Sequence, residues 1–139
     1  MLVAAEASVP ASEHEVFGLL ADLDRHRLLT DGGMRILRLD GPPGRRSGGV
    51  VELRGPLGLR RHARTRVAGA DFPTRLWGTA ETARGSRAAL RWQLRPETGG
   101  TRVRVEVEIA PSGRDKLLLA CGGRIWLWRR LRASLRRVA

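Results

Sequence analysis

The sequence predicts an α+β fold in which a strongly bent antiparallel sheet of about seven strands is wrapped around one long C-terminal helix. Short segments between residues 34 and 109 alternate apolar and polar side chains, and turns rich in Gly and Pro separate them without an intervening helix. This pattern is typical of an antiparallel meander. Between residues 113 and 138, apolar residues instead recur at steps of three or four, as on one side of an α-helix.

The chain is expected to begin with a strand and two short helices. Weak alternation over residues 2–9 predicts the first strand. Ser12 and Glu15 have the spacing of a capping box, so a short helix should begin after Ser12. Asp22 can cap a second helix over residues 23–29.

Six strands are expected after these helices. In the last of them Val103 and Val105 share one face, whereas Arg102 and Arg104 share the other. Such alternation is typical of an antiparallel sheet that packs on one face only. The apolar face is the surface that a one-sided C-terminal helix needs. The expected strands cover residues 34–39, 50–54, 59–67, 75–82, 87–95 and 101–109.

The predicted C-terminal helix is long enough to cross a small domain, since about 25 helical residues span roughly 37 Å. Its apolar residues fall on one side of the helix when they are plotted at about 100° per residue. We expect this apolar stripe to face the sheet. The stripe consists of Leu117, Cys121, Ile125, Trp128, Leu131, Leu135 and Val138.

The length of 139 residues fits a single domain over residues 1–139. Cys121 is the only cysteine in the sequence, so no disulfide can form within the chain. The N-terminal sequence MLVAAEASVP has no basic region and carries Glu6 within its apolar stretch, which argues against a signal peptide. No apolar run approaches the ~20 residues of a membrane-spanning helix. We therefore expect a soluble, cytoplasmic protein.

The net charge of +12 by itself suggests nucleic acid or an anionic membrane surface as a partner. Lys116 is, however, the only lysine among 26 basic residues, and electrostatic binding gives no reason to exclude lysine. GC-rich codon usage explains such a skew, so we do not expect nucleic acid as a partner. Basic residues are concentrated after residue 113, which keeps an anionic membrane surface as a candidate partner. The sequence leaves open whether the protein is a monomer or a homodimer.

Motifs for metal binding and covalent catalysis are absent from the sequence. His14, His26 and His62 do not have metal-ligand spacing, and Cys121 has no neighbouring cysteine or histidine. The sequence also has no phosphate-binding loop, no dinucleotide-binding glycine pattern and no nucleophile elbow. We therefore expect neither a metal site nor a cofactor, and we assign no catalytic residue.

Three parts of the chain resemble one family in their order and spacing. VPASEHEVF at residues 9–17 is followed by LADLDRH at residues 20–26, GGTRV at residues 99–103 precedes the last strand, and a closing helical segment covers residues 122–135. Together they resemble the START-like (SRPBCC) superfamily, and within it the polyketide cyclase/dehydrase-like branch. The resemblance implies a helix-grip fold with an elongated apolar cavity between the sheet and the last helix. It also implies binding of a hydrophobic small molecule such as a lipid, a polyketide or an isoprenoid-like compound.

The candidate ligand-binding residues lie on the predicted inner faces of the sheet and helix. On the expected register Arg61 points inward, where it could hold a ligand carboxylate or enolate or, as a strand-end arginine, extend to water. Arg124 falls within the apolar stripe and could meet a ligand or an inward Glu52. The large tryptophans either stack on a planar ligand or fill the core. The candidate residues are Leu53, Arg61, Ala63, Thr65, Trp77, Leu90, Trp92, Val105, Val107, Cys121, Arg124, Ile125 and Trp128.

These observations lead to three hypotheses about function. The first is binding of a hydrophobic small molecule in a cavity between the sheet and the C-terminal helix. The alternative is a cyclase or dehydratase that acts on a polyketide-like substrate and uses an inward polar group to stabilise charge. The third is docking of the basic surface to an anionic membrane or to nucleic acid.

Overall fold

The computed structural model describes residues 1–22, 34–42, 47–54, 60–82, 85–113 and 124–137 of the chain. The expected second helix over residues 23–29 lies outside these ranges, as do residues 114–123 of the expected C-terminal helix. The elements are β1 (Leu2–Val9), α1 (Glu13–Ala21), β2 (Met34–Asp40), β3 (Gly48–Arg54), β4 (Arg60–Asp71), β5 (Arg75–Thr82), β6 (Arg87–Glu97), β7 (Gly100–Ala110) and α3 (Arg124–Arg137).

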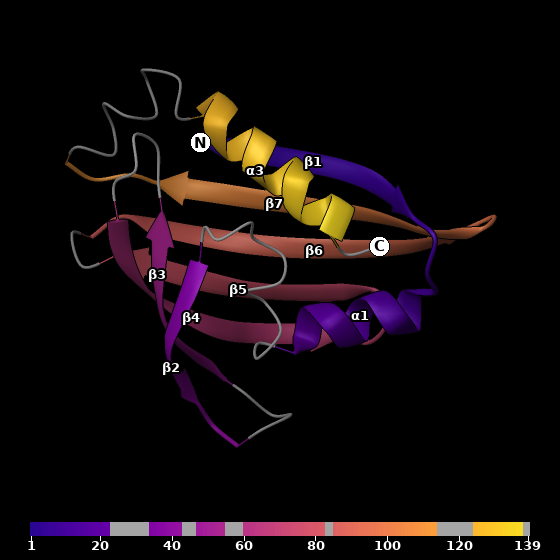
Figure 1. The fold of residues 1–139 in the computed structure, drawn as a ribbon, viewed down its shortest axis with the longest axis horizontal. Coiled ribbons are helices and arrows are strands. Elements are labelled where there is room, and N and C mark those ends of the chain that lie inside the picture. Colours follow the sequence, from indigo (N-terminus) through magenta and orange to yellow (C-terminus); the bar gives the residue numbers. More distant parts are fainter. Residues whose placement is uncertain (23–33, 43–46, 55–59, 83–84, 114–123, 138–139) are drawn as a thin grey trace.

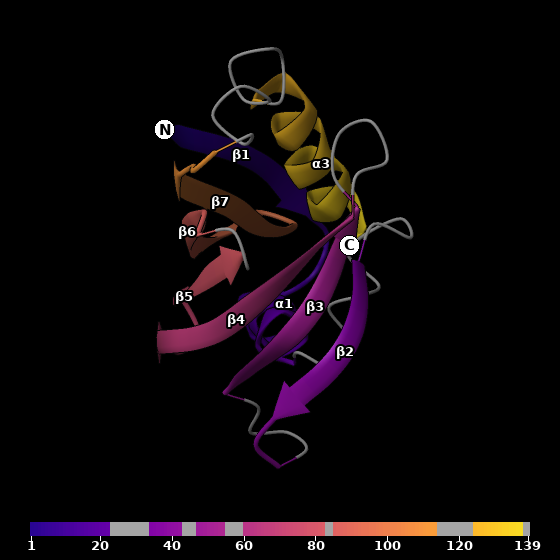
Figure 2. The same ribbon diagram turned by 90° about the vertical axis from the view of Figure 1, so that its left-hand side faces the viewer.

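The seven strands form one antiparallel sheet with the order β1-β7-β6-β5-β4-β3-β2. Each strand from β2 to β7 pairs with its neighbour in sequence, and β1 adds to the far edge beside β7 (Figure 1). The sheet is strongly bent, and α1 and α3 both lie on its concave side (Figure 2). The predicted α+β fold with a bent antiparallel sheet and a C-terminal helix is therefore confirmed.

Strands β2, β3, β4, β6 and β7 all extend beyond their predicted bounds, and β4 and β6 do so past a Gly and a Pro, respectively. Strand β4 continues past Gly69 to Asp71 because a register shift between Val67 and Gly69 absorbs one extra residue. Gly69 is required there by close packing, since a Cβ on it would meet the ring of Trp77. Strand β6 continues through Pro96, which lies beyond the last residue pair with β5, so its missing N–H interrupts no ladder on that side.

The two faces of the sheet differ as the alternation predicts. Cross-strand partners on the concave face are apolar, for example Ala5, Val105 and Trp92, which lie opposite one another on β1, β7 and β6. The convex face carries the charged residues of the same strands. The main core lies between the concave face, α1 and the end of α3. It contains Ala5, Val9, Val16, Phe17, Leu20, Leu76, Trp92, Leu94, Val103, Val105, Val107 and Leu135.

Helix α1 closes one end of the concave face. The Ser12 hydroxyl accepts a hydrogen bond from the backbone N–H of Glu15 at 3.2 Å, which confirms Ser12 as the N-cap. The helix then buries Val16, Phe17 and Leu20, and its contacts are with β5, β6 and β7. The capping bond therefore sets where the helix starts and which side chains reach the sheet.

Helix α3 lies along β1, the edge strand, and among its described side chains those that reach the core belong to its C-terminal half. Leu135 is 0% exposed and Leu131 packs against the core, whereas Ile125 is 60% exposed and Trp128 is 39% exposed. The expectation that Ile125 and Trp128 face the sheet is therefore wrong. The physical reason is that an edge strand offers a narrow surface, so the helix buries only a part of its apolar stripe.

We predict that Leu135→Ala destabilises the protein by about 2–5 kcal/mol, because it leaves a cavity where a fully buried leucine packs. The matched control is Ile125→Ala on the same helix, which should change the free energy of unfolding by less than about 0.5 kcal/mol. Urea unfolding of the two variants measures both values. A loss for Ile125→Ala as large as that for Leu135→Ala would contradict the placement of α3.

Candidate functional site

The side chains on the concave face differ in size from one end of the face to the other. Near α1 a row of large side chains crosses the sheet, made of Leu76, Trp92 and Val105, and all three are buried. Further along the strands the row that follows contains Gly78, between Val67 on β4 and Leu90 on β6. The band of large side chains near α1 is therefore interrupted by a glycine in the next row.

A row of small side chains crosses the sheet next. Gly49, Thr65, Ala80 and Ala88 are successive cross-strand partners on β3, β4, β5 and β6, and we call them the small-residue row. Thr65, Ala80 and Ala88 are only half-buried. Because these side chains project little from the sheet, we expect the concave face to be lower here than at the Trp92 row two rows away. The sizes of these side chains predict a shallow trough across the middle of the sheet.

Arg61 lies at the far end of this face. It pairs with Leu53 on β3, and both are half-buried on the concave side, one row beyond Val51 and Ala63. Within the described strands, Arg61 is the only charged residue whose position in the alternation falls on the concave face. The remaining polar side chains on this face are threonine hydroxyls. A single guanidinium in an apolar surface is suited to an anionic group of a ligand.

Glu52, in contrast, lies on the convex face. Its carboxylate contacts Nε2 of His62 at 3.3 Å and the guanidinium of Arg60 at 3.7 Å. The expectation that Glu52 points inward toward Arg124 is therefore wrong, because Glu52 pairs with His62 across the ladder and cross-strand partners share a face. The side chain of Arg124 lies outside the described residues.

The structure separates the other predicted site residues into distinct groups. Trp92, Val105 and Val107 belong to the packed core, and Ala63 is buried. Trp77 lies on the convex face, because it pairs with the exposed Arg91. Cys121 lies outside the described residues. Leu53, Arg61, Thr65 and Leu90 are the predicted residues that the structure places half-buried on the concave face.

Sequence reasoning predicted Thr65 as a ligand contact but not the other members of the small-residue row, Gly49, Ala80 and Ala88. Alternation along β5 and β6 places Ala80 and Ala88 on the same face as Leu76 and Trp92. Most of the predicted contacts are large residues, whereas small residues mark where a ligand has room.

The convex face carries a network of ion pairs over β1 and β7. The Arg102 guanidinium donates a hydrogen bond to the Glu6 carboxylate at 2.8 Å, and Arg104 contacts both Glu6 at 3.6 Å and Glu106 at 2.8 Å. The hydrogen bond from Arg102, together with the positive charge of Arg104, lowers the pKa of Glu6 below its ordinary value. This network makes the convex face polar and stable in water, which leaves the concave face for apolar contacts.

A depression of about 530 Å³ lies at the ends of β5, β6 and β7, and the ion pair of Arg87 with Glu81 borders it. Most of its lining side chains, among them Thr79, Ala89 and Glu108, belong to the convex face. Ala80, Ala88 and Ile109 of the concave face also line it, so the depression adjoins the small-residue row at the ends of these strands. The apolar cavity expected under the last helix stays a prediction, because part of its expected boundary falls on residues 114–123.

Two further classes of site are absent from the described part of the chain. No group of three or more His, Cys, Asp or Glu side chains there is arranged to hold a metal ion. No helix in the same ranges is long and apolar enough to cross a membrane.

Several solved structures share this fold over 99% of the chain. Protein CV1439 from Chromobacterium violaceum is 15% identical with a TM-score of 0.74, and 94% of that chain is covered. Ms6760 from Mycobacterium smegmatis is 14% identical with a TM-score of 0.71 and 87% covered. TTHA0849 from Thermus thermophilus is 17% identical with a TM-score of 0.69 and 94% covered. At such identities the likeness shows the fold alone.

The bent sheet with its C-terminal helix is that of the START-like (SRPBCC) proteins, as the sequence resemblance implied. Residues 2–139 match the family described as "Polyketide cyclase / dehydrase and lipid transport". The chain belongs to this family. A search for relatives among curated proteins found no match.

We predict that Glu6→Gln lowers the melting temperature at neutral pH and that this difference disappears in acid. The pKa of Glu6 is lowered in the folded state, so its charge stabilises the fold above its ordinary pKa of 4.5. That contribution is lost as the pH falls through the lower folded pKa. Thermal melts of both proteins between pH 7 and about pH 3 measure the effect. In an Arg102→Gln background the substitution should matter less, and an undiminished effect there would contradict the coupling.

Proposed function

We propose that the protein binds a hydrophobic small molecule, such as a lipid, a polyketide or an isoprenoid-like compound, on the concave face of the sheet. The small-residue row carries this proposal, because Gly49, Thr65, Ala80 and Ala88 leave room where a packed core would need large side chains. The family's description, which names lipid transport and polyketide chemistry, supports the same class of ligand.

The borders of the trough fit an elongated apolar ligand. Val67 and Leu90 flank the small-residue row on the side toward α1, and Val51 and Ala63 form the next row on the other side. The main contacts of α3 are with β1, and those of α1 are with β5, β6 and β7. A ligand along the row would bury its apolar surface against aliphatic side chains, at about 25 cal/mol per Å².

Arg61 supports a narrower proposal, that the ligand carries an anionic group. Its guanidinium has a fixed charge and a fork of donors that matches a carboxylate. Arg61 lies two rows from the small-residue row, so an apolar chain in the trough would extend its head group toward it. The preferred ligand would then be an amphipathic acid.

The same guanidinium favours a second candidate function, the cyclisation or dehydration named in the family's description. Both reactions pass through an enolate, and a positioned cation stabilises the negative charge that develops on its oxygen. A general base is needed in addition to abstract a proton. Formation of a cyclised or dehydrated product from a poly-β-keto substrate, lost in Arg61→Gln, would support this function over simple binding.

We predict that Leu90→Trp weakens binding of an apolar ligand by about 10-fold or more, because the larger ring fills the space opposite Gly78. The matched control is Ala89→Trp, on the same strand but on the convex face, which should bind as the wild type does. Mass spectrometry of molecules that co-purify with the protein identifies the ligand, and Nile red fluorescence measures its affinity. Equal losses in both variants, or no apolar ligand bound by the wild type, would contradict the proposal.

We predict that Arg61→Gln weakens binding of dodecanoate by about 10-fold or more and leaves dodecanol binding unchanged, because only the acid presents a charge to the guanidinium. Arg60→Gln is the matched control, since the Arg60 side chain pairs with Glu52 on the convex face. Displacement of Nile red by the two compounds gives both affinities. Equal losses for acid and alcohol would assign Arg61 a structural role and leave the apolar site itself unaffected.

A further inference from the structure

Besides the concave face of the sheet, the outward face of α3 carries an unusual group of exposed side chains. Ile125, Arg129, Arg132 and Arg136 follow one another at steps of three or four along this helix, and Trp128 lies beside them. All five side chains are exposed, and we call them the α3 basic row. At about 100° per residue Arg132 falls only about 20° from Ile125, so charged and apolar groups share one face.

The charges of this row are not balanced by acids. The sequence of α3, RIWLWRRLRASLRR, contains no Asp or Glu. Within the described ranges no carboxylate forms an ion pair with Arg129, Arg132 or Arg136. Carboxylates on the sheet are instead paired with cations of the sheet. These are Asp40, Glu52, Asp71, Glu81, Glu6 and Glu106.

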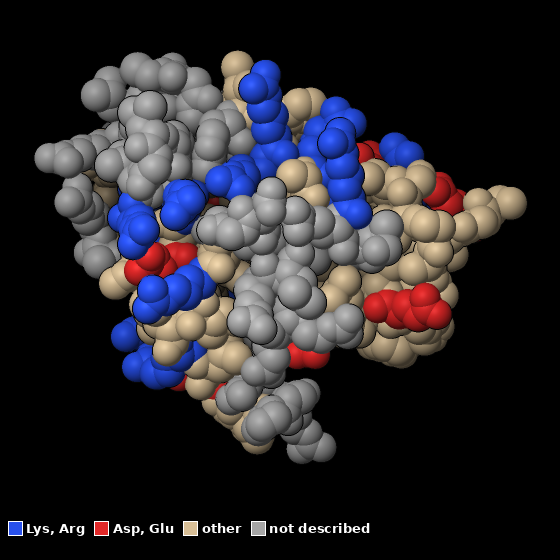
Figure 3. All heavy atoms as spheres, in the orientation of Figure 1, with Lys and Arg blue, Asp and Glu red and all other residues tan. Residues whose placement is uncertain are grey.

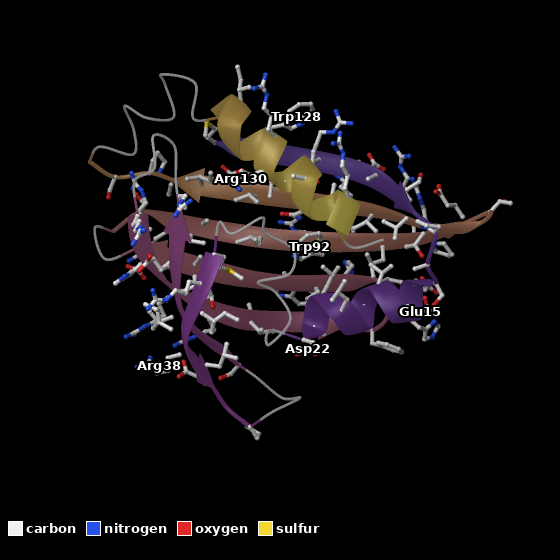
Figure 4. All side chains as sticks on the ribbon, viewed as in Figure 1. Glu15, Asp22, Arg38, Trp92, Trp128 and Arg130 are labelled. Carbon is white, nitrogen blue, oxygen red and sulfur yellow. The ribbon has the colours of Figure 1, made fainter. Side chains whose placement is uncertain are left out.

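Figure 3 shows the result as a cluster of Lys and Arg side chains over α3, with the nearest acidic side chains of this view at the right-hand edge of the cluster. Trp128 and Arg130 leave the helix on different sides (Figure 4). The uncompensated positive charge is therefore a property of one side of α3.

The exposed apolar groups of the row have no partner surface in the described part of the fold. Trp128 lies beneath the guanidinium of Arg132, with 4.9 Å between the guanidinium carbon and the ring centre. Ile125 is more exposed still. Trp beside Arg is typical of helices that lie at a membrane interface, where the ring sits among the head groups and the cations contact phosphate.

We propose that the α3 basic row docks the protein onto the surface of an anionic phospholipid bilayer. The arginines supply the attraction to the negative head groups, and Ile125 and Trp128 enter the boundary between head groups and acyl chains. A bilayer uses the cations and the exposed aliphatic group together, whereas a nucleic acid backbone uses the cations alone. The inference does not rest on the proposed ligand site, because these side chains point away from the concave face.

The experiment uses the full chain and two kinds of vesicle, pure phosphatidylcholine and phosphatidylcholine with about one-third phosphatidylglycerol. Flotation should recover the protein with the anionic vesicles at about 0.05 M NaCl and lose it at about 0.5 M, because salt screens surface charges. The combined variant Arg129→Gln, Arg132→Gln and Arg136→Gln should reduce the partition coefficient by about 100-fold.

The matched control removes the same charge elsewhere. Arg64→Gln, Arg66→Gln and Arg95→Gln change exposed arginines of the sheet, and their effect should stay below about 5-fold. A second pair of variants separates insertion from charge. Ile125→Ala with Trp128→Ala should reduce partitioning by about 10-fold, and Leu37→Ala with Phe72→Ala, which are also exposed, should not.

Equal losses in the two arginine variants would overturn the proposal, since net charge and not α3 would then control binding. No recovery of the wild type with anionic vesicles would also overturn it. Retention of a DNA duplex that depends on the α3 arginines, without vesicle binding, would assign the row to nucleic acid instead. Circular dichroism and thermal melts of each variant confirm that the fold is kept.

Discussion

The pairing of β1 with β7 is the contact on which the rest of the structure depends. It joins residues about 100 positions apart, from Leu2 opposite Glu108 to Val9 opposite Thr101. The amino group of Met1 donates to the carbonyl of Ile109 at 2.8 Å, and the Thr101 hydroxyl donates to the carbonyl of Ala11 at 2.7 Å. These bonds fix both ends of β1. Because α3 packs along β1, the position of the C-terminal helix follows from this pairing.

The register of this pairing gives the sheet one apolar face and one charged face. In β7 the same alternation directs Val103, Val105 and Val107 to the concave side and Arg104 and Glu106 to the convex side. A slip of one residue would bury the charges and expose the valines. The cross-strand ion pairs on the convex side oppose such a slip, so the network around Glu6 contributes to specificity of register as well as to stability.

Much of this could be predicted from the sequence, because alternation and turn residues are local signals. The strand from Arg75 to Thr82 has the predicted bounds, and Ser12 caps α1 as expected. The predictions that were wrong concern side chains whose surroundings depend on long-range geometry. A helical wheel gives the apolar side of α3, but it does not show that packing on an edge strand would leave Ile125 exposed.

Two residues of the candidate site show the same limit of sequence-based prediction. The size of Trp77 predicts a place near the helix–sheet interface, although its neighbour Leu76 is the residue that alternation aligns with Trp92. For Glu52, only the register of β3 on β4, which sets it beside His62, places it on the convex face. Alternation along a single strand divides its residues between two faces, but it does not say which face is concave. The pairing with the neighbouring strand decides that.

The positions of the acidic residues change the interpretation of the arginine content of the chain. GC-rich codon usage, which we expect to explain the choice of arginine over lysine, would act on every element alike. It does not account for the distribution of carboxylates, which accompany arginines on the sheet, as Glu106 accompanies Arg91 and Arg104, and are absent from α3. If the basic residues were only a compositional background, the helix would be expected to carry acids at the frequency of the strands. The asymmetry between the sheet and α3, and not the net charge, is therefore the observation that points to an anionic partner.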